Sequence, residues 1–502
     1  MRYRLDRSVR RRERGRVLLG GSPVRLLRLT EAGAELVRRL AAGEEVRSTR
    51  GVDALVGRLV DAGMLHPDPA SAGDAAPDPS AVTVVVPVRD RPRGLSRLLG
   101  ALARSGLGGI VVVDDGSTVP VEVPHGVELV RHDAPSGPAA ARNAGAARAR
   151  TPFVAFVDSD CLPTGDWLAP LLGHFADPSV AAVAPRVTAP PPTGPEPPRG
   201  SLAGYERLRS PLDLGAEPGR VAAGTRTSYV PAATLLVRAD RFAEIGGFDA
   251  SMRYGEDVDL VWRLADAGHR VRYEPRSVVH HDVRATPADW LRQRVGYGSS
   301  AAELEARHPG KVAPAVVSPW SAAMWALGVL GHPVAAAVLG AGTVAATAGR
   351  LAEVPRRDAV RLAVTGHLAA GRQLAEAVVR AWWPIALPLA VVDRRARRIT
   401  AAAVAATAAD AVVQHRRATR ADAAATGQLP GPAAFAGLAL LDHAAYGAGV
   451  WLGCARRRSL RALLPRRTRA GSVMRHPGAH PDAAAQNRTA RGRRWCTNEN
   501  VF

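Results

Sequence analysis

Two aspartates one residue apart follow a strongly apolar run, and their side chains could bind a cation together. Residues 153–157 are all apolar, Asp158 comes directly after them, and Asp160 follows. Such a run is typical of a strand buried on both faces of a parallel sheet, and open α/β sheets bind ligands at the carboxyl ends of such strands. Carboxylates at this spacing can approach one hard divalent cation together with substrate phosphates. The pair alone also fits a solvated turn, because aspartate favours turns.

Two strands earlier in the chain are expected to end at the same edge. Apolar runs at residues 82–88 and 110–113 are separated by a segment with leucines at helical spacing, and two aspartates, the later being Asp115, follow the second run. This order predicts a right-handed parallel crossover. The chain has no Gly-x-Gly-x-x-Gly after the first strand, which argues against a dinucleotide-binding fold. Asp115 could instead contact ribose hydroxyls or the edge of a pyrimidine.

A run of small residues opens a helix just before the aspartate pair. It covers residues 136–145 and contains Arg142 and Asn143. Small side chains at a helix N-terminus let a nucleotide approach the backbone amides closely, and Arg142 could add positive charge. The alternative for this segment is an ordinary packed helix.

The order of these motifs resembles the family-two glycosyltransferases of GT-A fold. Their pattern is a strand with a proline, a strand ending in Asp-Asp-Gly-Ser, a helix with Ala-Arg-Asn-x-Gly, and a strand ending in Asp-x-Asp, and the match extends here from residue 82 to about 290. The resemblance implies an α/β fold with a mainly parallel sheet between helices. It also implies that a nucleotide sugar is bound by Pro87, Arg89, Asp115, Arg142, Asn143 and Asp158.

The same resemblance assigns the acceptor side of the reaction to Glu256 and Asp257. In the family this acidic motif begins a helix and supplies the base that deprotonates the acceptor hydroxyl, so Asp257 is the expected base. A carboxylate within hydrogen-bond reach can take up such a proton. Glu256 and Asp259 could instead stabilise the helix N-terminus through its dipole.

The expected cofactor is Mg²⁺ or Mn²⁺, held by Asp160. The cation would offset the charge on the departing nucleotide, while Asp158 would face the donor sugar or the ribose. Many relatives place a histidine after the catalytic segment as a further metal ligand, which implies His280, with His281 in reserve. A purely structural histidine is the alternative.

The chain is strongly basic, with a formal net charge of +21 over 502 residues. Such a charge suggests a nucleic-acid or membrane partner. Lys311 is the only lysine, and the sequence is rich in Ala, Gly, Arg and Pro throughout, so its arginine content is weak support for either partner. Three widely spaced cysteines predict neither a disulfide framework nor a zinc site, which fits a reducing compartment. The arginine-rich N-terminus is not followed by the apolar core of a signal peptide.

Residues 1–67 are expected to form a small winged-helix-like module. Two short strands surround the Gly-Gly-Ser-Pro turn at residues 20–23, Thr30 is a candidate helix N-cap, and a second amphipathic helix closes at Gly63. The module resembles the PqqD-like peptide-recognition modules, which implies that it selects an acceptor and does no chemistry. A DNA-binding winged helix and a structural cap are the alternatives. A Pro-rich linker at residues 68–81 separates it from the catalytic domain, residues 82–311.

Residues 312–466 are expected to form a helical, membrane-associated region. Residues 312–349 carry no charged side chain, a length sufficient to span a bilayer, and two further apolar stretches follow at 381–392 and 432–455. Prolines and abundant Ala and Gly also suit a wholly soluble helical domain. The tail, residues 467–502, is polar and is expected to be disordered.

The combination of parts resembles the glycosyltransferase family of mycofactocin biosynthesis. It implies an inverting, metal-dependent enzyme that moves a sugar, expected to be glucose from UDP-glucose, to a peptide-derived redox cofactor. We expect it to be membrane-associated on the cytoplasmic face of the cell membrane and to bind no nucleic acid. The enzymatic alternative elongates a cell-envelope polysaccharide or a lipid-linked glycan; a sugar nucleotidyltransferase fits the Glu-Asp motif less well. A DNA-binding regulator and a structural membrane protein are the alternatives from other classes.

Overall fold

The computed structural model describes residues 1–190, 200–283, 286–351, 354–421 and 429–468. These residues form two compact units, the first chiefly up to Val283 and the second from Thr286 onward. All the predicted site residues lie in the first unit. Most of the predicted tail lies outside the described residues.

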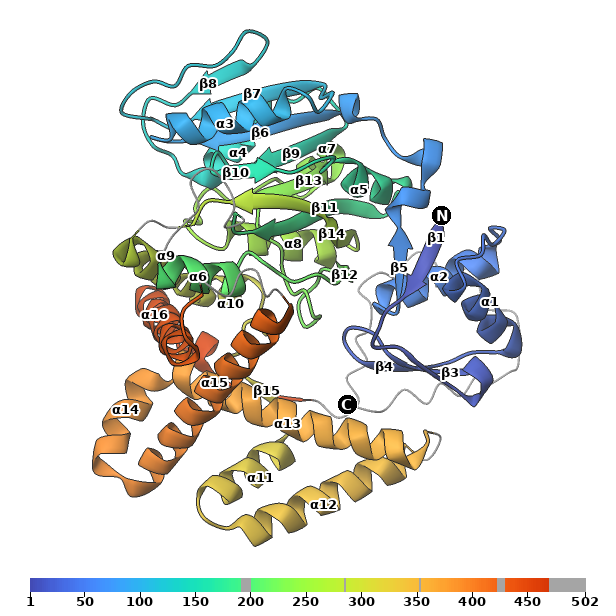
Figure 1. The fold of residues 1–502 in the computed structure, drawn as a ribbon, viewed down its shortest axis with the longest axis vertical. Helices are drawn as coiled ribbons and strands as arrows, with labels where there is room; N and C mark the ends of the chain where they lie inside the picture. Colours follow the sequence, from blue (N-terminus) through green and yellow to red (C-terminus); the bar gives the residue numbers. More distant parts are fainter. Residues whose placement is uncertain (191–199, 284–285, 352–353, 422–428, 469–502) are drawn as a thin grey trace. The chain divides into compact units, whose positions relative to one another are not determined.

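A nine-stranded mixed sheet forms the centre of the first unit (Figure 1). Its order is β10-β14-β11-β13-β9-β6-β7-β8, and β12 pairs with β14. The strands are β6 (Val82–Val88), β7 (Gly109–Asp114), β8 (Glu128–Arg131), β9 (Phe153–Val157), β10 (Cys161–Pro163), β11 (Val180–Thr188), β12 (Gly219–Arg220), β13 (Thr234–Arg238) and β14 (Arg270–His281).

The half of the sheet made of β9, β6, β7 and β8 is parallel, as predicted. β13 then runs antiparallel to both β9 and β11, so the other half is mixed. The α/β class is confirmed. The predicted strand at residues 153–157 is β9, and all five of its residues are buried.

The helices that pack against the sheet are α3 (Pro92–Leu102), α4 (Pro138–Ala146), α5 (Ala169–Leu172), α7 (Ala239–Glu244) and α8 (Glu256–Asp266). Helix α6 (Ser201–Arg209) lies between β11 and β12 in the chain. The leucine stripe of α3 is buried in the same apolar core as alternate valines of β6. α4 packs directly on β6, where a Cβ at Gly145 would stand 2.3 Å from Val85 Cγ1. Only glycine permits this approach, which brings the N-terminus of α4 to the carboxyl edge of the sheet.

The N-terminal module has the predicted strands and helices. β1 (Arg2–Leu5) pairs with β5 (Leu65–Asp68), and β2 (Arg10–Arg12), β3 (Val17–Gly20) and β4 (Arg25–Arg28) form a second sheet. The helices are α1 (Glu31–Ala41) and α2 (Arg50–Asp61). The Thr30 hydroxyl accepts a hydrogen bond from the Gly33 amide, which confirms the predicted cap of α1.

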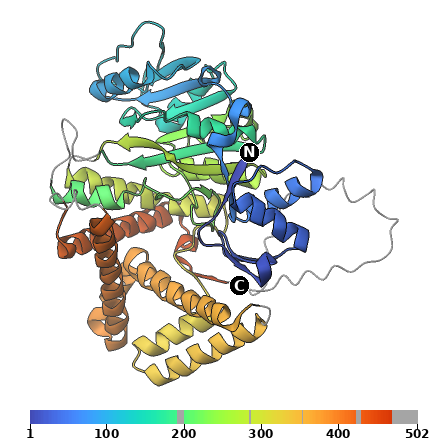
Figure 2. The ribbon, with the colours of Figure 1, turned by 45° about the vertical axis from the view of Figure 1, so that its right-hand side comes forward.

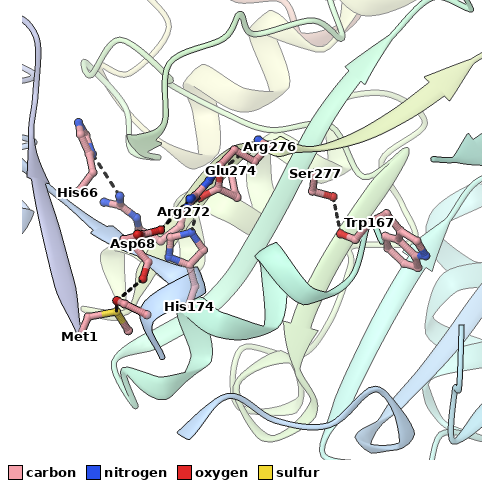
Figure 3. Close-up of polar contacts among 10 residues, drawn as sticks. Met1, His66, Asp68, Trp167, His174, Arg272, Glu274, Arg276 and Ser277 are labelled. Atoms are coloured by element: carbon pink, nitrogen blue, oxygen red, sulfur yellow. Dashed lines mark hydrogen bonds and ion pairs between the residues drawn. The ribbon is translucent and has the colours of Figure 1, made fainter. Parts of the chain in front are cut away.

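A buried polar network joins this module to the catalytic sheet (Figure 3). His66 Nε2 lies 2.8 Å from Asp6 Oδ2, while Arg272 Nη2 of β14 lies 3.2 Å from His66 Nδ1. Because a guanidinium can only donate, Nδ1 must accept and the neutral ring donates from Nε2 to Asp6. Burial, with the Arg272 charge adding to it, lowers the pKa of His66 below its ordinary value. At its outer edge the network ends in the Arg276–Asp68 ion pair, 2.7 Å long.

The predicted linker, residues 68–81, is folded against the catalytic domain. It forms short 3-10 helices at Pro69–Ser71, Gly73–Ala75 and Pro79–Ala81. Pro69 is buried, and a Cβ at Gly173 would come within 2.3 Å of the Pro69 carbonyl oxygen. The segment therefore packs against the catalytic domain at Pro69, while residues 73–75 are exposed.

The second unit is helical: α9 (Pro287–Ser299), α10 (Ala301–Arg307), α11 (Pro319–Val329), α12 (Pro333–Arg350), α13 (Arg356–Arg380), α14 (Trp383–Val392), α15 (Arg394–Ala421) and α16 (Pro432–Arg457). It also pairs the short strands β15 (Val316–Val317) and β16 (Arg466–Arg467). The uncharged stretch 312–349 is not one helix, because the chain turns at Gly331 and α11 packs beside α12 (Figure 2).

Within the described residues, one helix, α16, is long and apolar enough to cross a membrane, and 44% of its most apolar window is buried. α13 and α14 pass the same test as a pair, but the chain bends by 86° between them. Neither α12 nor α14 buries any described residue. Apolar side chains of both helices are instead exposed, among them Val334, Val338, Val391 and Val392.

Candidate active site

The predicted aspartate pair lies at the carboxyl end of β9, as expected. The Asp158 amide donates to the Ala233 carbonyl of the neighbouring chain segment, 2.9 Å away, and this bond closes the strand. Asp160 is mostly buried, and its Oδ2 lies 3.0 Å from Arg91 Nη1. Its other oxygen, Oδ1, lies 3.4 Å from His281 Nε2. One carboxylate thus lies between a guanidinium and an imidazole.

Arg142 of α4 connects the aspartate pair to the predicted acceptor side. Its Nη2 donates to Asp158 Oδ1 at 2.7 Å and its Nη1 donates to Glu256 Oε1 at 3.0 Å. Only 4% of the Arg142 side chain is exposed, and its guanidinium carbon lies 5.4 Å from the centre of the Phe248 ring. Burial alone disfavours the charged guanidinium, but the two carboxylates outweigh it and hold the pKa of Arg142 above its ordinary value.

Glu256 and Asp257 begin α8 directly after Gly255, whose φ of 80° is in the left-handed region. Asp257 Oδ1 accepts from the Val258 amide at 2.8 Å and Oδ2 accepts from the Ala232 amide at 3.3 Å. Burial raises the pKa of Asp257 despite these bonds. Burial, with the neighbouring Asp257 adding to it, raises the pKa of Glu256 to about 7. The raised pKa values suit a carboxylate that takes up a proton near neutral pH.

Asp115 organises the loop before α4. Its Oδ1 accepts from the Ser136 amide at 2.8 Å, and its Oδ2 accepts from the Gly137 amide at 2.9 Å. His132 Nδ1 lies 2.9 Å from the same Oδ1. Asp115 therefore fixes the loop so that the N-terminus of α4 lies at the sheet edge. There the backbone amides of α4 can face an anion.

A cavity of about 640 Å³ lies at the carboxyl edge of the sheet, and neither Glu256 nor Asp257 lines it. Its volume is in the usual range for small-molecule sites. Six of the predicted site residues line it: Pro87, Arg89, Asp115, Arg142, Asp158 and Asp160. The N-terminus of α4 forms one wall, through Gly137, Pro138 and Ala139.

Two predicted residues are directed elsewhere. Asn143 donates to the Phe248 carbonyl at 2.7 Å and accepts from the Phe248 amide at 3.0 Å, so it holds the turn before α8. His280 Nδ1 lies 3.0 Å from Thr188 Oγ1 of β11, and the histidine beside Asp160 is His281. The structure thus brings the reserve histidine, and not the first choice, to the aspartate pair.

A scan against family models matches residues 83–229 to glycosyl transferase family 2. The chain is 42% identical over 475 residues to the pre-mycofactocin glycosyltransferase of Mycobacterium tuberculosis, covering 92% of this chain and 96% of that protein. The chain belongs to the pre-mycofactocin glycosyltransferase family. The glycosyltransferase class expected from the motifs is confirmed, and the α/β sheet agrees with the GT-A fold that the family implies.

More distant relatives and solved structures are also similar to this glycosyltransferase. The glycosyltransferase AglE of Haloferax volcanii is 25% identical over 230 residues, which are 43% of this chain and 72% of that protein. The mannosyltransferase PcManGT of Pyrobaculum calidifontis, solved with GDP-Man and Mn²⁺, superposes with a TM-score of 0.35 at 21% identity, covering 59% of this chain and 88% of that one. GalNAc-T7, solved with UDP, GalNAc and Mn²⁺, has a TM-score of 0.32 at 18% identity, covering 50% of this chain and 53% of that one.

The residues of this glycosyltransferase fit a divalent cation that shares its coordination with substrate. Among the described residues no group of three or more His, Cys, Asp or Glu side chains could enclose a metal ion. Asp160 and His281 together offer a carboxylate oxygen and an imidazole nitrogen. Two protein ligands suit a cation that completes its shell with substrate phosphate oxygens and water. The site thus fits a cation bound together with a diphosphate.

Arg91 is the main functional candidate that was missed from the sequence. It lines the cavity and pairs with Asp160. The signal that could have found it is its place in the polar turn 89–91, which directly follows the buried strand β6 and ends at the same edge as Asp158.

Proposed function

We propose that this glycosyltransferase transfers glucose from UDP-glucose to the peptide-derived mycofactocin precursor, with inversion at the anomeric carbon. The observation that carries the proposal is the bridge made by Arg142, which bonds Asp158 on the donor side and Glu256 on the acceptor side. One buried side chain thereby joins the predicted donor-binding carboxylate, which lines the cavity, to the predicted base motif. Membership in the pre-mycofactocin family supports the acceptor.

The arrangement supports a single displacement. Asp257 takes the proton from an acceptor hydroxyl, whose oxygen attacks the anomeric carbon from the face opposite the diphosphate. The bond between that carbon and the diphosphate oxygen breaks, and UDP leaves with the electron pair. The α4 amides and Arg89 lie at the cavity where they can offset the developing charge. Asp160 and His281 would hold a Mg²⁺ or Mn²⁺ ion, which supplies Lewis-acid stabilisation of the same charge.

The proposal is tested by incubating the full-length protein with UDP-glucose and the mycofactocin precursor. We expect a product heavier by one or more hexose units, observed by mass spectrometry. Transfer should stop after exhaustive chelation and return with Mn²⁺ or Mg²⁺, because Asp160 needs the cation to engage the diphosphate. Product from a lipid-linked or polysaccharide acceptor alone would support the glycan-elongating alternative. Full activity after chelation would contradict the metal requirement.

We also propose that the N-terminal module binds the acceptor. β2 is the edge of its three-stranded sheet and consists of three arginines. An edge strand can pair with an extended peptide through main-chain bonds, and the arginines favour an acidic one. Because the module shares a buried network with β14, a point change tests this role better than deletion. Arg11 is exposed, so Arg11→Glu should leave the fold intact. The change should raise the KM for the acceptor while slow hydrolysis of UDP-glucose persists.

The second unit is proposed to attach the enzyme to the cytoplasmic face of an anionic bilayer. Val391 and Val392 of α14 are 75% and 80% exposed, and Arg394 and Arg395 follow after Asp393. Apolar side chains beside arginines fit the boundary between acyl chains and acidic headgroups. UDP-sugars are made in the cytosol, so the catalytic unit must face that side.

The attachment predicts that the full-length protein pellets with membranes and resists a high-salt wash, because burial of apolar area is not screened by ions. Changing both Val391 and Val392 to glutamate should convert the attachment to one that salt releases. A matched pair of changes at the exposed Val119 of the catalytic unit and Val24 of the module should have no effect. Release of the unaltered protein by salt alone would show that charge, and not apolar burial, holds it.

A further inference from the structure

Arg91 and a divalent cation would compete for the same carboxylate. Arg91 Nη1 lies 3.0 Å from Asp160 Oδ2, and His281 Nε2 lies 3.4 Å from Asp160 Oδ1. A cation held by Asp160 and His281 would therefore lie within a few ångströms of a permanently charged guanidinium. Two positive charges this close repel each other unless an anion lies beside both.

The Arg91 side chain can leave Asp160 without a change in its backbone. Its side chain is 42% exposed, whereas that of Asp160 is 10% exposed. The turn that carries it is held firmly: the Asp90 amide donates to Ser117 Oγ at 3.0 Å, and Asp90 Oδ1 accepts from the Thr118 amide at 2.8 Å. A fixed backbone and a long, partly exposed side chain allow a change of rotamer alone.

The anion that would accept both charges is the donor diphosphate. Arg91, Arg89 and the N-terminus of α4 line one cavity with Asp160. A diphosphate in that cavity can be bridged by the cation and can also take the charge-assisted bonds that the guanidinium gives up at Asp160. The same arginine then opposes the cation when it binds alone and supports it when the nucleotide is present.

We propose that Arg91 couples the binding of the cation to the binding of the nucleotide by exchanging Asp160 for the donor diphosphate. The inference rests on the proposed function, since it takes the diphosphate and the cation from it. The coupling is reciprocal, so the cation should raise the affinity for UDP by the same factor by which UDP raises the affinity for the cation. The enzyme would in this way avoid holding a cation that has no nucleotide to bridge.

The test is calorimetric titration of the full-length protein with Mn²⁺ alone, with UDP alone, and with UDP at saturating Mn²⁺. In Arg91→Gln we expect Mn²⁺ alone to bind about tenfold more tightly and UDP at saturating Mn²⁺ to bind about tenfold more weakly, a size typical of couplings between sites. Arg93→Gln is the matched control, because it removes an equal charge from an exposed position two residues away, in the first turn of α3. Its affinities should equal those of the unaltered protein.

The opposite signs of the two changes distinguish this role from a structural one. A variant that merely loosens the site would lose affinity in both titrations, and this outcome would overturn the inference. Equal coupling in Arg91→Gln and the unaltered protein would overturn it too. If the unaltered protein binds UDP but binds no Mn²⁺, whether UDP is present or absent, the metal-dependent function itself fails, and the inference fails with it.

Discussion

Replacing Asp257 by asparagine is expected to lower the kcat for glucose transfer by about 100-fold or more while the affinity for UDP changes little. The amide is nearly the same size as the carboxyl group but cannot take up the hydroxyl proton. Asp257 is held by the amides of Val258 and Ala232, and it does not line the cavity assigned to the donor. The loss should therefore appear in turnover, measured at saturating donor and acceptor.

The pH profile gives a second readout for Asp257. Burial raises its pKa, and the protonated carboxyl cannot act as a base, so kcat of the unaltered enzyme should fall as pH drops through that raised pKa. This acidic limb should be absent in Asp257→Asn. Asp240→Asn, in the first turn of α7, is the control for loss of a carboxylate at a helix N-terminus. Normal turnover in Asp257→Asn would dismiss Asp257 as the base.

Replacing Arg142 by methionine is expected to destabilise the first unit by about 3–5 kcal/mol, because the change leaves the buried Glu256 and the partly buried Asp158 without their partner. Asp158 and Glu256 both bond this guanidinium. The deficit should shrink as pH falls: protonation removes the buried charges, and a carboxyl group whose pKa is raised by folding adds stability at low pH and loses it as pH rises. Urea unfolding at several pH values measures the effect.

A triple change separates the two roles of Arg142. Adding Asp158→Asn and Glu256→Gln to Arg142→Met replaces every charge of the bridge by a neutral group, and most of the lost stability should return. Glucose transfer should not return, since the donor carboxylate remains absent. Arg142→Lys keeps one charge but cannot bond both partners in the same way, so its stability should lie between those of the unaltered protein and Arg142→Met. A stable Arg142→Met protein would show that the carboxylates find other partners.

Much of the site could be predicted from local sequence because its residues end buried strands. The apolar runs that became β6, β7 and β9 led to Pro87, Asp115 and Asp158, and parallel strands bring their carboxyl ends to one edge. The antiparallel β13 was not foreseen. An apolar run shows that a strand is buried but not its direction, which depends on where the preceding connection delivers the chain.

The position of the histidine beside Asp160 depended on strand register. Side chains alternate between the two faces of a strand, so a shift of one residue exchanges His280 for His281. β14 carries an irregularity opposite Pro185 and Arg186 of β11, after which its pairing resumes at Val278. Which face of the sheet the last side chains of β14 take therefore cannot be found by counting along the sequence. In the structure Cys161 of β10 pairs with His281, and His281 lies beside Asp160.

Local sequence alone was sufficient for the edge carboxylates, the cap of α1 and the order of β6, α3 and β7, because each rests on burial pattern or turn chemistry within a few residues, whereas the GT-A fold was expected from the family resemblance. The bridge from Arg142 to Glu256 spans 114 positions, and the contact between His66 and Arg272 spans 206. No local pattern reports such pairs. They arise because close packing brings α4 to the start of α8, and β5 to the start of β14, where a buried charge or ring must find a partner.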